Sequence, residues 1–433
     1  MNNFLVQKKW KRQLLLAAAF VFGFVKMNAQ FSNQAHLLID TLTSQEFNGR
    51  GYSDGADKKT ADFISSHFKS YGLKSFNENF YQPFHFDVNT FPGIVSLSLN
   101  NSVLKPGVDF IIQAYSSTTD GNFEVVHMIG KKTSKVSYLK KILGNDLHNK
   151  VLVWDKEDFD PKNYSLWINT LQQIKGWGAS GAVEFTTAKL TMDMSMEADG
   201  FAFYTVNNGT KSSDVNEVTI HLENKLMSNY ESQNVIGFIP GTIHSDSFIV
   251  FSAHYDHLGQ LGNGTYFPGA NDNASGISML LTLAHYFSLH PQPYSICFMA
   301  FSGEEMGLVG SQYFTEHPLF PLSQIKFLTN MDIVGTGDEG IKVVNGAVLT
   351  SPFNALVEIN DSLQLLKSVQ PRGKAANSDH YFFFEKGVPS FFIYTLGGIA
   401  AYHDVFDKSE TLPLTEFDDL TKLLIAFTQS LED

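Results

Sequence analysis

The chain has 433 residues, with 31 basic and 44 acidic side chains and 43% hydrophobic residues. At roughly 150 residues per domain, this length predicts two or three domains. The acidic balance argues against nucleic acid or an anionic membrane surface as a partner. The single cysteine, Cys297, rules out an internal disulfide and a cysteine-ligated structural zinc, and its apolar neighbours predict a core position.

Residues 1–29 have the pattern of a secretory signal peptide. Basic residues fill most of 8–12, an apolar run follows at 14–25, and Ala29 offers a small residue for cleavage. The apolar run is too short to span a membrane, so we expect no membrane anchor in the mature chain. We expect cleavage near Ala29 and export to the periplasm or the extracellular space. The mature chain would then carry 26 basic and 44 acidic residues, a net charge of −18.

Residues 36–76 have helical periodicity, interrupted by a glycine-rich turn at 48–55. Within that turn, residues 51–55 match the G-x-S-x-G pattern of serine hydrolases. That pattern requires a preceding strand, whereas residues 45–50 are polar, so Ser53 is interpreted as a turn residue. Residues 77–107 alternate aromatic and polar side chains and predict two or three strands.

Residues 108–225 differ in texture and predict an inserted, smaller α+β domain. The segment 150–154 predicts a strand, 171–185 a helix, tight turn and strand, and 218–222 a further strand. Few metal-ligating side chains occur in this block. We therefore expect a lid or spacer that is dispensable for metal binding.

The remaining segments, 30–107 and 226–433, predict one α/β domain. Short apolar strands alternate with helical segments at 277–289, 308–314 and 353–366. This alternation is typical of a mixed, largely parallel central sheet covered by helices on both faces. The predicted strands are 234–239, 248–251, 295–301, 327–331 and 390–394.

Ionisable side chains follow several of these strands. His254 and Asp256 come directly after one strand, and a loop rich in glycine and asparagine leads from them to Asp272. The carboxyl ends of strands in such sheets are where ligands bind. Other ionisable groups follow later strands or lie in a late turn: Glu304, Glu305, Asp332 and His403.

Two imidazoles and three carboxylates, without thiolate, suit hydrolytic Zn²⁺, or Mn²⁺ and Co²⁺. Three carboxylates and one hydroxide would balance two divalent ions, which avoids uncompensated buried charge. Of the adjacent glutamates, one can bind metal while the other accepts a proton from water. Spacing alone leaves open which glutamate does which.

Five segments resemble the metal-site motifs of the M28 family of zinc aminopeptidases, in the same order: SAHYDHLG, PGANDNASG, FSGEEMGLVGS, NMDIVG and YHDVFD. The resemblance covers about 31–100 and 230–433, and the early segment 47–73 takes part in it. It implies two zinc ions per chain. One would be bound by His254 and Asp332, the other by Glu305 and His403, with Asp272 bridging them.

The resemblance also implies roles around the metals. Glu304 would be the general base, Asp256 would orient His254, and Tyr402 would donate a hydrogen bond to the oxyanion. Asp379 and His380 lie in a further family segment that we place beside the site, with no assigned role. The inserted block is similar to a protease-associated domain.

The expected function is therefore an exported zinc exopeptidase, most simply an aminopeptidase acting on peptides. Glutaminyl cyclases, which use one zinc, and carboxypeptidases of the same family remain alternatives. A catalytically inactive, receptor-like binding protein is a further one, although such proteins commonly lose ligands and this chain keeps all five.

Overall fold

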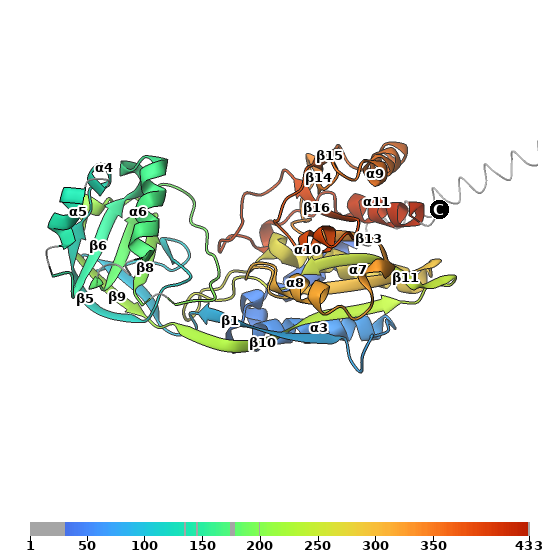
Figure 1. Ribbon diagram of the computed structural model, residues 1–433, viewed down its shortest axis with the longest axis horizontal. Helices are drawn as coiled ribbons and strands as arrows, with labels where there is room; N and C mark the ends of the chain where they lie inside the picture. The colour runs from blue at the N-terminus through green and yellow to red at the C-terminus, as the bar shows by residue number, and fades with distance from the viewer. Residues whose placement is uncertain (1–30, 134–135, 144–145, 174–177, 199, 432–433) are drawn as a thin grey trace, which may run out of the picture.

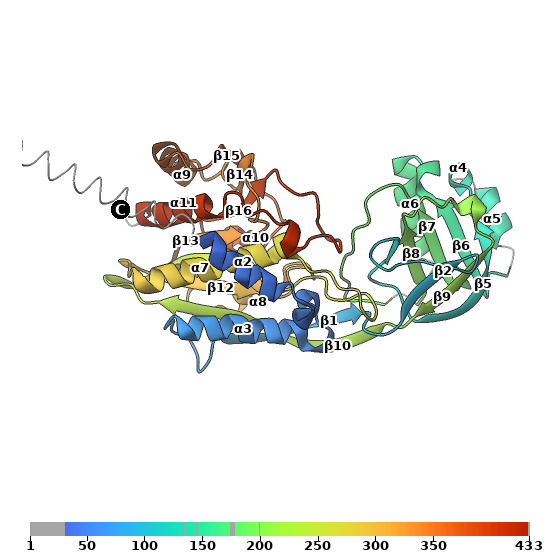
Figure 2. The ribbon, with the colours of Figure 1, turned by 180° about the vertical axis from the view of Figure 1, so that it is seen from behind.

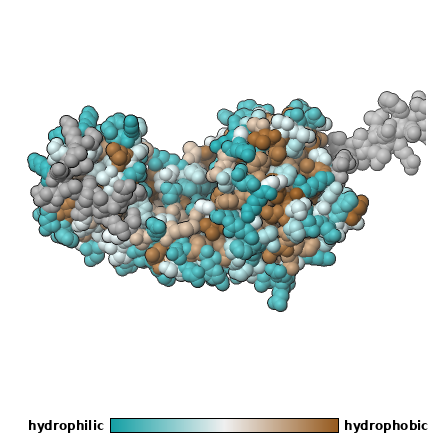
Figure 3. Space-filling view, viewed as in Figure 1, coloured by the Kyte–Doolittle hydropathy of each residue, from teal (hydrophilic) through white to brown (hydrophobic). Residues whose placement is uncertain are grey.

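The computed structural model describes residues 31–133, 136–143, 146–173, 178–198 and 200–431. The expected signal segment 1–29 lies outside these residues. The described chain forms two lobes, each built on an eight-stranded sheet (Figures 1 and 2). Figure 3 shows a hollow on the upper side between them. Among the described residues, no helix combines the length and apolarity that crossing a membrane requires.

The larger lobe holds the first sheet, whose order is β1-β10-β12-β11-β13-β16-β14-β15. Its four central strands, β12, β11, β13 and β16, run parallel, and antiparallel pairings flank them. This is the mixed, largely parallel sheet expected. The strands are β1 (Tyr81–Thr90), β10 (Lys225–Ile239), β11 (His244–His254), β12 (Tyr294–Phe301), β13 (Ile325–Met331), β14 (Gly340–Val344), β15 (Val369–Arg372) and β16 (Ser390–Leu396).

Helices cover both faces of this sheet. One face packs into a core with α2 (Phe31–Leu42), α3 (Ala56–Ser70), α7 (Ser275–Leu289), α9 (Thr350–Leu363) and α11 (Phe417–Ser430). The other packs against α8 (Val309–Glu316) and α10 (His380–Glu385). Residues 248–251 of β11 are apolar throughout because both of their faces are buried. Each such side chain contributes about 1.5–3 kcal/mol on burial.

The smaller lobe holds the second sheet, ordered β3-β2-β9-β5-β6-β7-β8-β4. Helices α4 (Gly130–Thr133), α5 (Val136–Leu143) and α6 (Pro161–Gln173) belong to this lobe (Figure 1). The strands are β2 (Val95–Leu99), β3 (Ser102–Val103), β4 (Phe110–Ile112), β5 (Thr119–His127), β6 (Lys150–Asp155), β7 (Gly181–Phe185), β8 (Ala202–Val206) and β9 (Glu217–Leu222).

Strand pairing moves the expected domain boundary. Val95 pairs with Leu222 in the second sheet, whereas Thr90 pairs with Lys225 in the first. The second sheet therefore already includes residues 95–99. The second domain begins before residue 108, which is the boundary that the change in sequence texture predicts. Strand 95–99 has the alternation of any half-buried strand, and alternation does not reveal which sheet a strand joins.

Candidate metal centre

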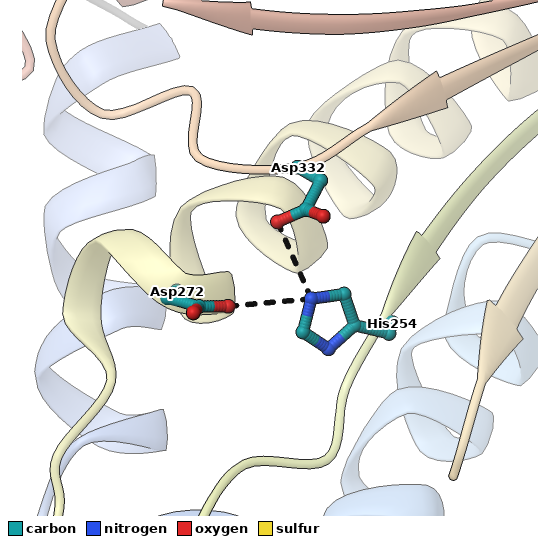
Figure 4. Close-up of side chains that lie close together, drawn as sticks. All are labelled: His254, Asp272 and Asp332. Carbon is teal, nitrogen blue, oxygen red and sulfur yellow. Dashed lines mark hydrogen bonds and ion pairs between the residues drawn. The ribbon is translucent and has the colours of Figure 1, made fainter. Parts of the chain in front are cut away.

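The first group of candidate ligands lies where two parallel strands end. His254 is the last residue of β11, and Asp332 follows β13, its neighbour in the sheet. Asp272 approaches from the loop before α7 (Figure 4). The His254 Nε2 atom lies 3.3 Å from Asp332 Oδ1 and 3.3 Å from Asp272 Oδ1. All three side chains are buried.

A second group meets the other oxygen of Asp272. His403 Nε2 lies 3.2 Å from Asp272 Oδ2 and 3.2 Å from Glu305 Oε2. The two oxygens of Asp272 therefore face two different histidines, as expected for a carboxylate shared between two metal ions.

The separations fit zinc. Ligand atoms at 2.0–2.1 Å from a tetrahedral zinc lie about 3.3–3.4 Å apart. The nitrogen-to-oxygen distances of 3.2–3.3 Å in both groups match that spacing. Imidazole and carboxylate without thiolate are also the donor types of hydrolytic zinc sites. The residues present therefore fit a zinc pair.

The electrostatics are those of an anionic cluster. Burial lowers the pKa of His254, but the carboxylates of Glu304 and Asp332 outweigh it and hold that pKa well above its ordinary value. Burial raises the pKa of Asp272, yet hydrogen bonds from His254 and His403 hold it well below the ordinary value. The site thus concentrates negative charge that divalent cations would neutralise.

The adjacent glutamates differ in environment. Glu305 lies 2.7 Å from His257 Nδ1, and its interactions with His257 and His403 overcome burial and lower its pKa to about 2. Glu304 Oε2 stays 4.0 Å from His254 Nε2, and burial raises the pKa of Glu304 well above its ordinary value. Glu304 lines the cavity over the cluster, which measures about 320 Å³.

That cavity also contains Tyr402, whose ring stacks on His403 with centroids 4.0 Å apart. Arg372 lines the same cavity, and its Nη1 donates to the Tyr394 hydroxyl at 3.2 Å. A larger cavity of about 660 Å³ lies around Tyr266 and Glu410. None of the candidate ligands lines it, so the smaller cavity is the one relevant to chemistry.

Asp256 makes several contacts besides the predicted one with His254. Its carboxylate lies 3.7 Å from His254 Nδ1, whereas its own backbone carbonyl is nearer, at 3.1 Å. The carboxylate also accepts the backbone N–H groups of Glu304 and Glu305 at 3.2 and 3.3 Å, and the Tyr52 hydroxyl at 2.7 Å. Asp256 thus ties the first metal group to the glutamate loop.

In the segment 378–380, the serine is the residue that contacts a candidate ligand. Ser378 Oγ donates to Asp332 Oδ2 at 2.8 Å and accepts from the Asn330 amide at 2.7 Å. Asp379 and His380 are buried beside it, and burial raises the pKa of Asp379 to about 7 and lowers that of His380 to about 4. Asp379 interacts electrostatically with His254 and Asp332, and the part that Asp379 and His380 take in the site stays a prediction.

Two charged residues hold the loop that carries Asp272. The Asp407 carboxylate accepts the backbone N–H groups of Asn271 and Asp272 at 2.9–3.1 Å. Arg50, fully buried, donates to backbone carbonyls of five residues on three segments: Leu42, Tyr255, Pro268, Gly269 and Asp272. The peptide bond between Asp272 and Asn273 is cis.

Sequence reasoning missed Arg50, Tyr52 and His257. All three lie in segments quoted for the family resemblance, but residue type alone assigned them no role. Ser53 lies in a 3-10 turn (Ser53–Gly55), and 3-10 structure also precedes it, so the turn interpretation is confirmed. Its neighbour Tyr52 is the member of that motif that reaches the site.

His257 is the main rival to His403 as a ligand, since His257, Asp272 and Glu305 lie close enough together to hold a metal ion. We favour His403 because its Nε2 faces both carboxylates and it lines the cavity. His257 contacts Glu305 through Oε1, whereas His403 faces the other oxygen, Oε2. This arrangement suits a residue that positions Glu305.

The second domain also reaches the site. His403 Nδ1 lies 3.0 Å from the backbone carbonyl oxygen of Met192, in the segment between β7 and β8. The block expected to be a spacer therefore contacts a candidate ligand directly, although it adds no side chain to the two ligand groups.

Comparison with known proteins identifies the larger domain. Residues 234–428 match the model of peptidase family M28. Aminopeptidase YwaD of Bacillus subtilis (strain 168) is 32% identical over 196 residues, which are 42% of this chain and 39% of that protein. A probable zinc metalloprotease of Pyrenophora tritici-repentis is 31% identical over 140 residues, 31% of this chain and 29% of that protein. The chain thus spans well under half the length of these curated relatives.

Solved structures extend the likeness to the whole fold. A zinc aminopeptidase from Bacillus subtilis superimposes with a TM-score of 0.67 at 20% identity, covering 92% of this chain and 94% of that one. A peptidase M28 precursor from Shewanella amazonensis SB2B gives 0.66 at 17% identity, covering 94% and 96%. The segment that matches the model of peptidase family M28 contains all five candidate ligands, and these solved structures share the fold of the chain.

Proposed function

We propose that this protein is an exported aminopeptidase that uses two zinc ions to remove N-terminal residues from peptides. The observation that carries the proposal is the position of Asp272. One of its oxygens faces His254 and the other faces His403. The printed names of the matched relatives, an aminopeptidase and a zinc metalloprotease, support the same activity class.

When bound, zinc supplies a water of lowered pKa and polarises the substrate carbonyl. The protein's own residues handle the proton and the substrate. Glu304, which lines the cavity and whose Oε2 lies 4.0 Å from His254 Nε2, takes the proton from the attacking water and delivers it to the leaving amine. The Tyr402 hydroxyl donates a hydrogen bond to the carbonyl oxygen as charge develops there.

The supporting side chains fix the ligands before substrate arrives. Asp407 and Arg50 hold the Asp272 loop, Ser378 orients Asp332, and Asp256 holds the backbone of both glutamates. A preorganised polar site costs no reorganisation during the reaction, which is where such sites gain rate.

Carboxypeptidase action is the second candidate, and Arg372 favours it. Arg372 is the only arginine or lysine among the described residues lining the cavity. An arginine fork binds a carboxylate well, and a free C-terminus would supply one.

Metal content and substrate preference test these assignments together. Elemental analysis should give two zinc ions per chain, and chelation should abolish hydrolysis. Peptides with a free N-terminus and a blocked C-terminus should be cleaved. Cleavage only of N-blocked peptides with a free C-terminus would establish the carboxypeptidase alternative. Full activity with one zinc on N-terminal glutamine would indicate a cyclase. Zinc binding without turnover on any of these peptides would indicate an inactive binding protein.

Export rests on residues 1–29, outside the described part of the chain. We expect the secreted form, isolated from a host that exports it, to begin near residue 30. N-terminal sequencing of that form checks the cleavage point.

A further inference from the structure

Lys189, from the second domain, holds the loop that carries Tyr402 and His403. Its ammonium nitrogen lies 2.7 Å from the Ala400 carbonyl oxygen and 2.9 Å from the Tyr402 carbonyl oxygen. It also lies 2.7 Å from Asp404 Oδ2. An ammonium group has three hydrogens, and here three oxygens of one short loop receive them.

The backbone beside Lys189 pairs with His403. The Met192 N–H donates to the His403 carbonyl at 2.9 Å, and His403 Nδ1 lies 3.0 Å from the Met192 carbonyl oxygen. Because a carbonyl oxygen only accepts, Nδ1 must carry the proton. Nε2 is then left as a lone-pair donor facing Asp272 and Glu305.

Apolar packing anchors this segment to the metal-site loops. Leu190 and Met192 are 8% and 3% exposed, and they belong to a buried cluster that draws on both domains. The members from the larger domain are Leu258, Leu261, Phe267 and Val405. Val405 is in the loop after His403, and Leu258 follows His257, so this part of the second domain is fixed against both sides of the site.

We propose that residues 187–193 of the second domain position His403 for metal binding, with Lys189 as the positioning residue. The inference rests on the proposed zinc site, and it makes the affinity of the zinc at Glu305 and His403 depend on a domain that contributes no ligand. Partners that fix the second nitrogen of a ligating histidine typically change metal affinity by 10–100-fold when removed.

The matched substitutions are at Lys189. Lys189→Met keeps most of the aliphatic stem and removes the three hydrogen bonds, and Lys189→Arg keeps the charge. Lys211→Met removes an exposed lysine of the same domain and serves as the control. Each full-length protein is stripped of metal and titrated with zinc against a competing chelator, and the melting temperature of each metal-free form is recorded.

Lys189→Met should weaken the second zinc by about 10-fold, the low end of that range because Lys189 holds the loop and not the Nδ1 atom itself, while the zinc at His254 and Asp332 keeps its affinity. Lys189→Arg should recover most of the loss, and Lys211→Met should match wild type. Lys189→Met should lower the metal-free melting temperature modestly, because it takes the partner from the buried Asp404 carboxylate, whereas Lys189→Arg and Lys211→Met should leave it near the wild-type value.

Equal affinity for both zinc ions in Lys189→Met and wild type would overturn the inference. A parallel loss of both zinc ions together with a lower metal-free melting temperature would also overturn it, since that is the effect of a general structural contact. Failure of the proposed zinc pair is distinguishable, because the wild-type protein would then bind fewer than two zinc ions before any variant is compared. Failure of the aminopeptidase activity alone leaves the zinc titration unchanged.

Discussion

At the scale of single residues, each candidate ligand depends on a neighbour that is not a ligand. Ser378 holds Asp332, Asp407 holds the Asp272 backbone, and His257 holds Glu305. Adjacent residues of one type can therefore have different roles. Glu305 is engaged by two imidazoles, whereas Glu304 faces the cavity.

The two glutamates should respond differently to the same substitution. Glu304→Gln keeps the size of the side chain but cannot accept a proton, so turnover should fall by about 10²–10⁴, or roughly 3–5 kcal/mol of barrier, with both zinc ions retained. Glu305→Gln should weaken one zinc, and added zinc should restore part of its activity. Zinc content and turnover, measured across a zinc titration, check both expectations. Rescue of Glu304→Gln by zinc would mean that the two roles are exchanged.

The choice between the two histidines can be tested with asparagine at each position. His403→Asn keeps a donor near the Nδ1 position but lacks Nε2, so the protein should lose the second zinc. His257→Asn keeps the donor that reaches Glu305 and should retain both zinc ions. Elemental analysis after dialysis separates the variants. The reverse result would make His257 the ligand and His403 its support.

At the scale of elements, the apolar strands and the residues after them were predictable. Residues 248–251 lie in the buried part of β11 as predicted, and the strand continues to His254, which the prediction placed just after it. Periodicity did not reveal which sheet the strand 95–99 joins. It also placed the start of a helix at residue 171, whereas α6 begins at Pro161. Contacts between distant segments could not be predicted from the sequence either. Arg50 and Lys189 donate to backbone carbonyls, and because every residue has a carbonyl, residue types do not indicate which ones accept these hydrogen bonds.

Arg50 is the element-scale feature most open to test. Its guanidinium joins the end of α2, the segment after β11 and the Asp272 loop through buried hydrogen bonds, and burial lowers its pKa to about 10. Arg50→Met leaves those carbonyls without their donor and should cost about 3–5 kcal/mol of unfolding free energy, as removing one member of a buried charged network does. Arg372→Met removes an exposed arginine and should cost little. Denaturant unfolding of both variants gives the comparison, and equal stability would contradict the bracing role of Arg50.

At the scale of the whole molecule, the second domain and the metal site are parts of one assembly. Thr90 and Lys225 are paired where the chain leaves the first sheet and where it re-enters it, so the second domain is inserted between them. Within that domain, residues 187–193 contact the loops that carry the candidate ligands. The acidic chain thus concentrates buried carboxylates where its two domains meet. Stability should therefore depend on both metal and pH.

Metal-free and zinc-loaded protein should respond to pH in opposite directions. Burial raises the pKa of Asp407 to about 6 and of Asp379 to about 7, and the carboxylates around His254 raise its pKa despite burial. The metal-free folded state thus holds more protons than the unfolded chain, and its stability falls as pH rises from about 4 to above 7. Zinc ligands must instead lose protons, so zinc stabilises the folded protein more as pH rises, by about 4 kcal/mol per site once free zinc is about 1,000 times its dissociation constant.

Melting curves between pH 5 and 8, with chelator or with zinc, should therefore diverge toward high pH. In Asp272→Asn, which lacks the shared carboxylate, zinc should separate the curves far less. Parallel curves for the wild-type protein would show that zinc does not bind this carboxylate cluster.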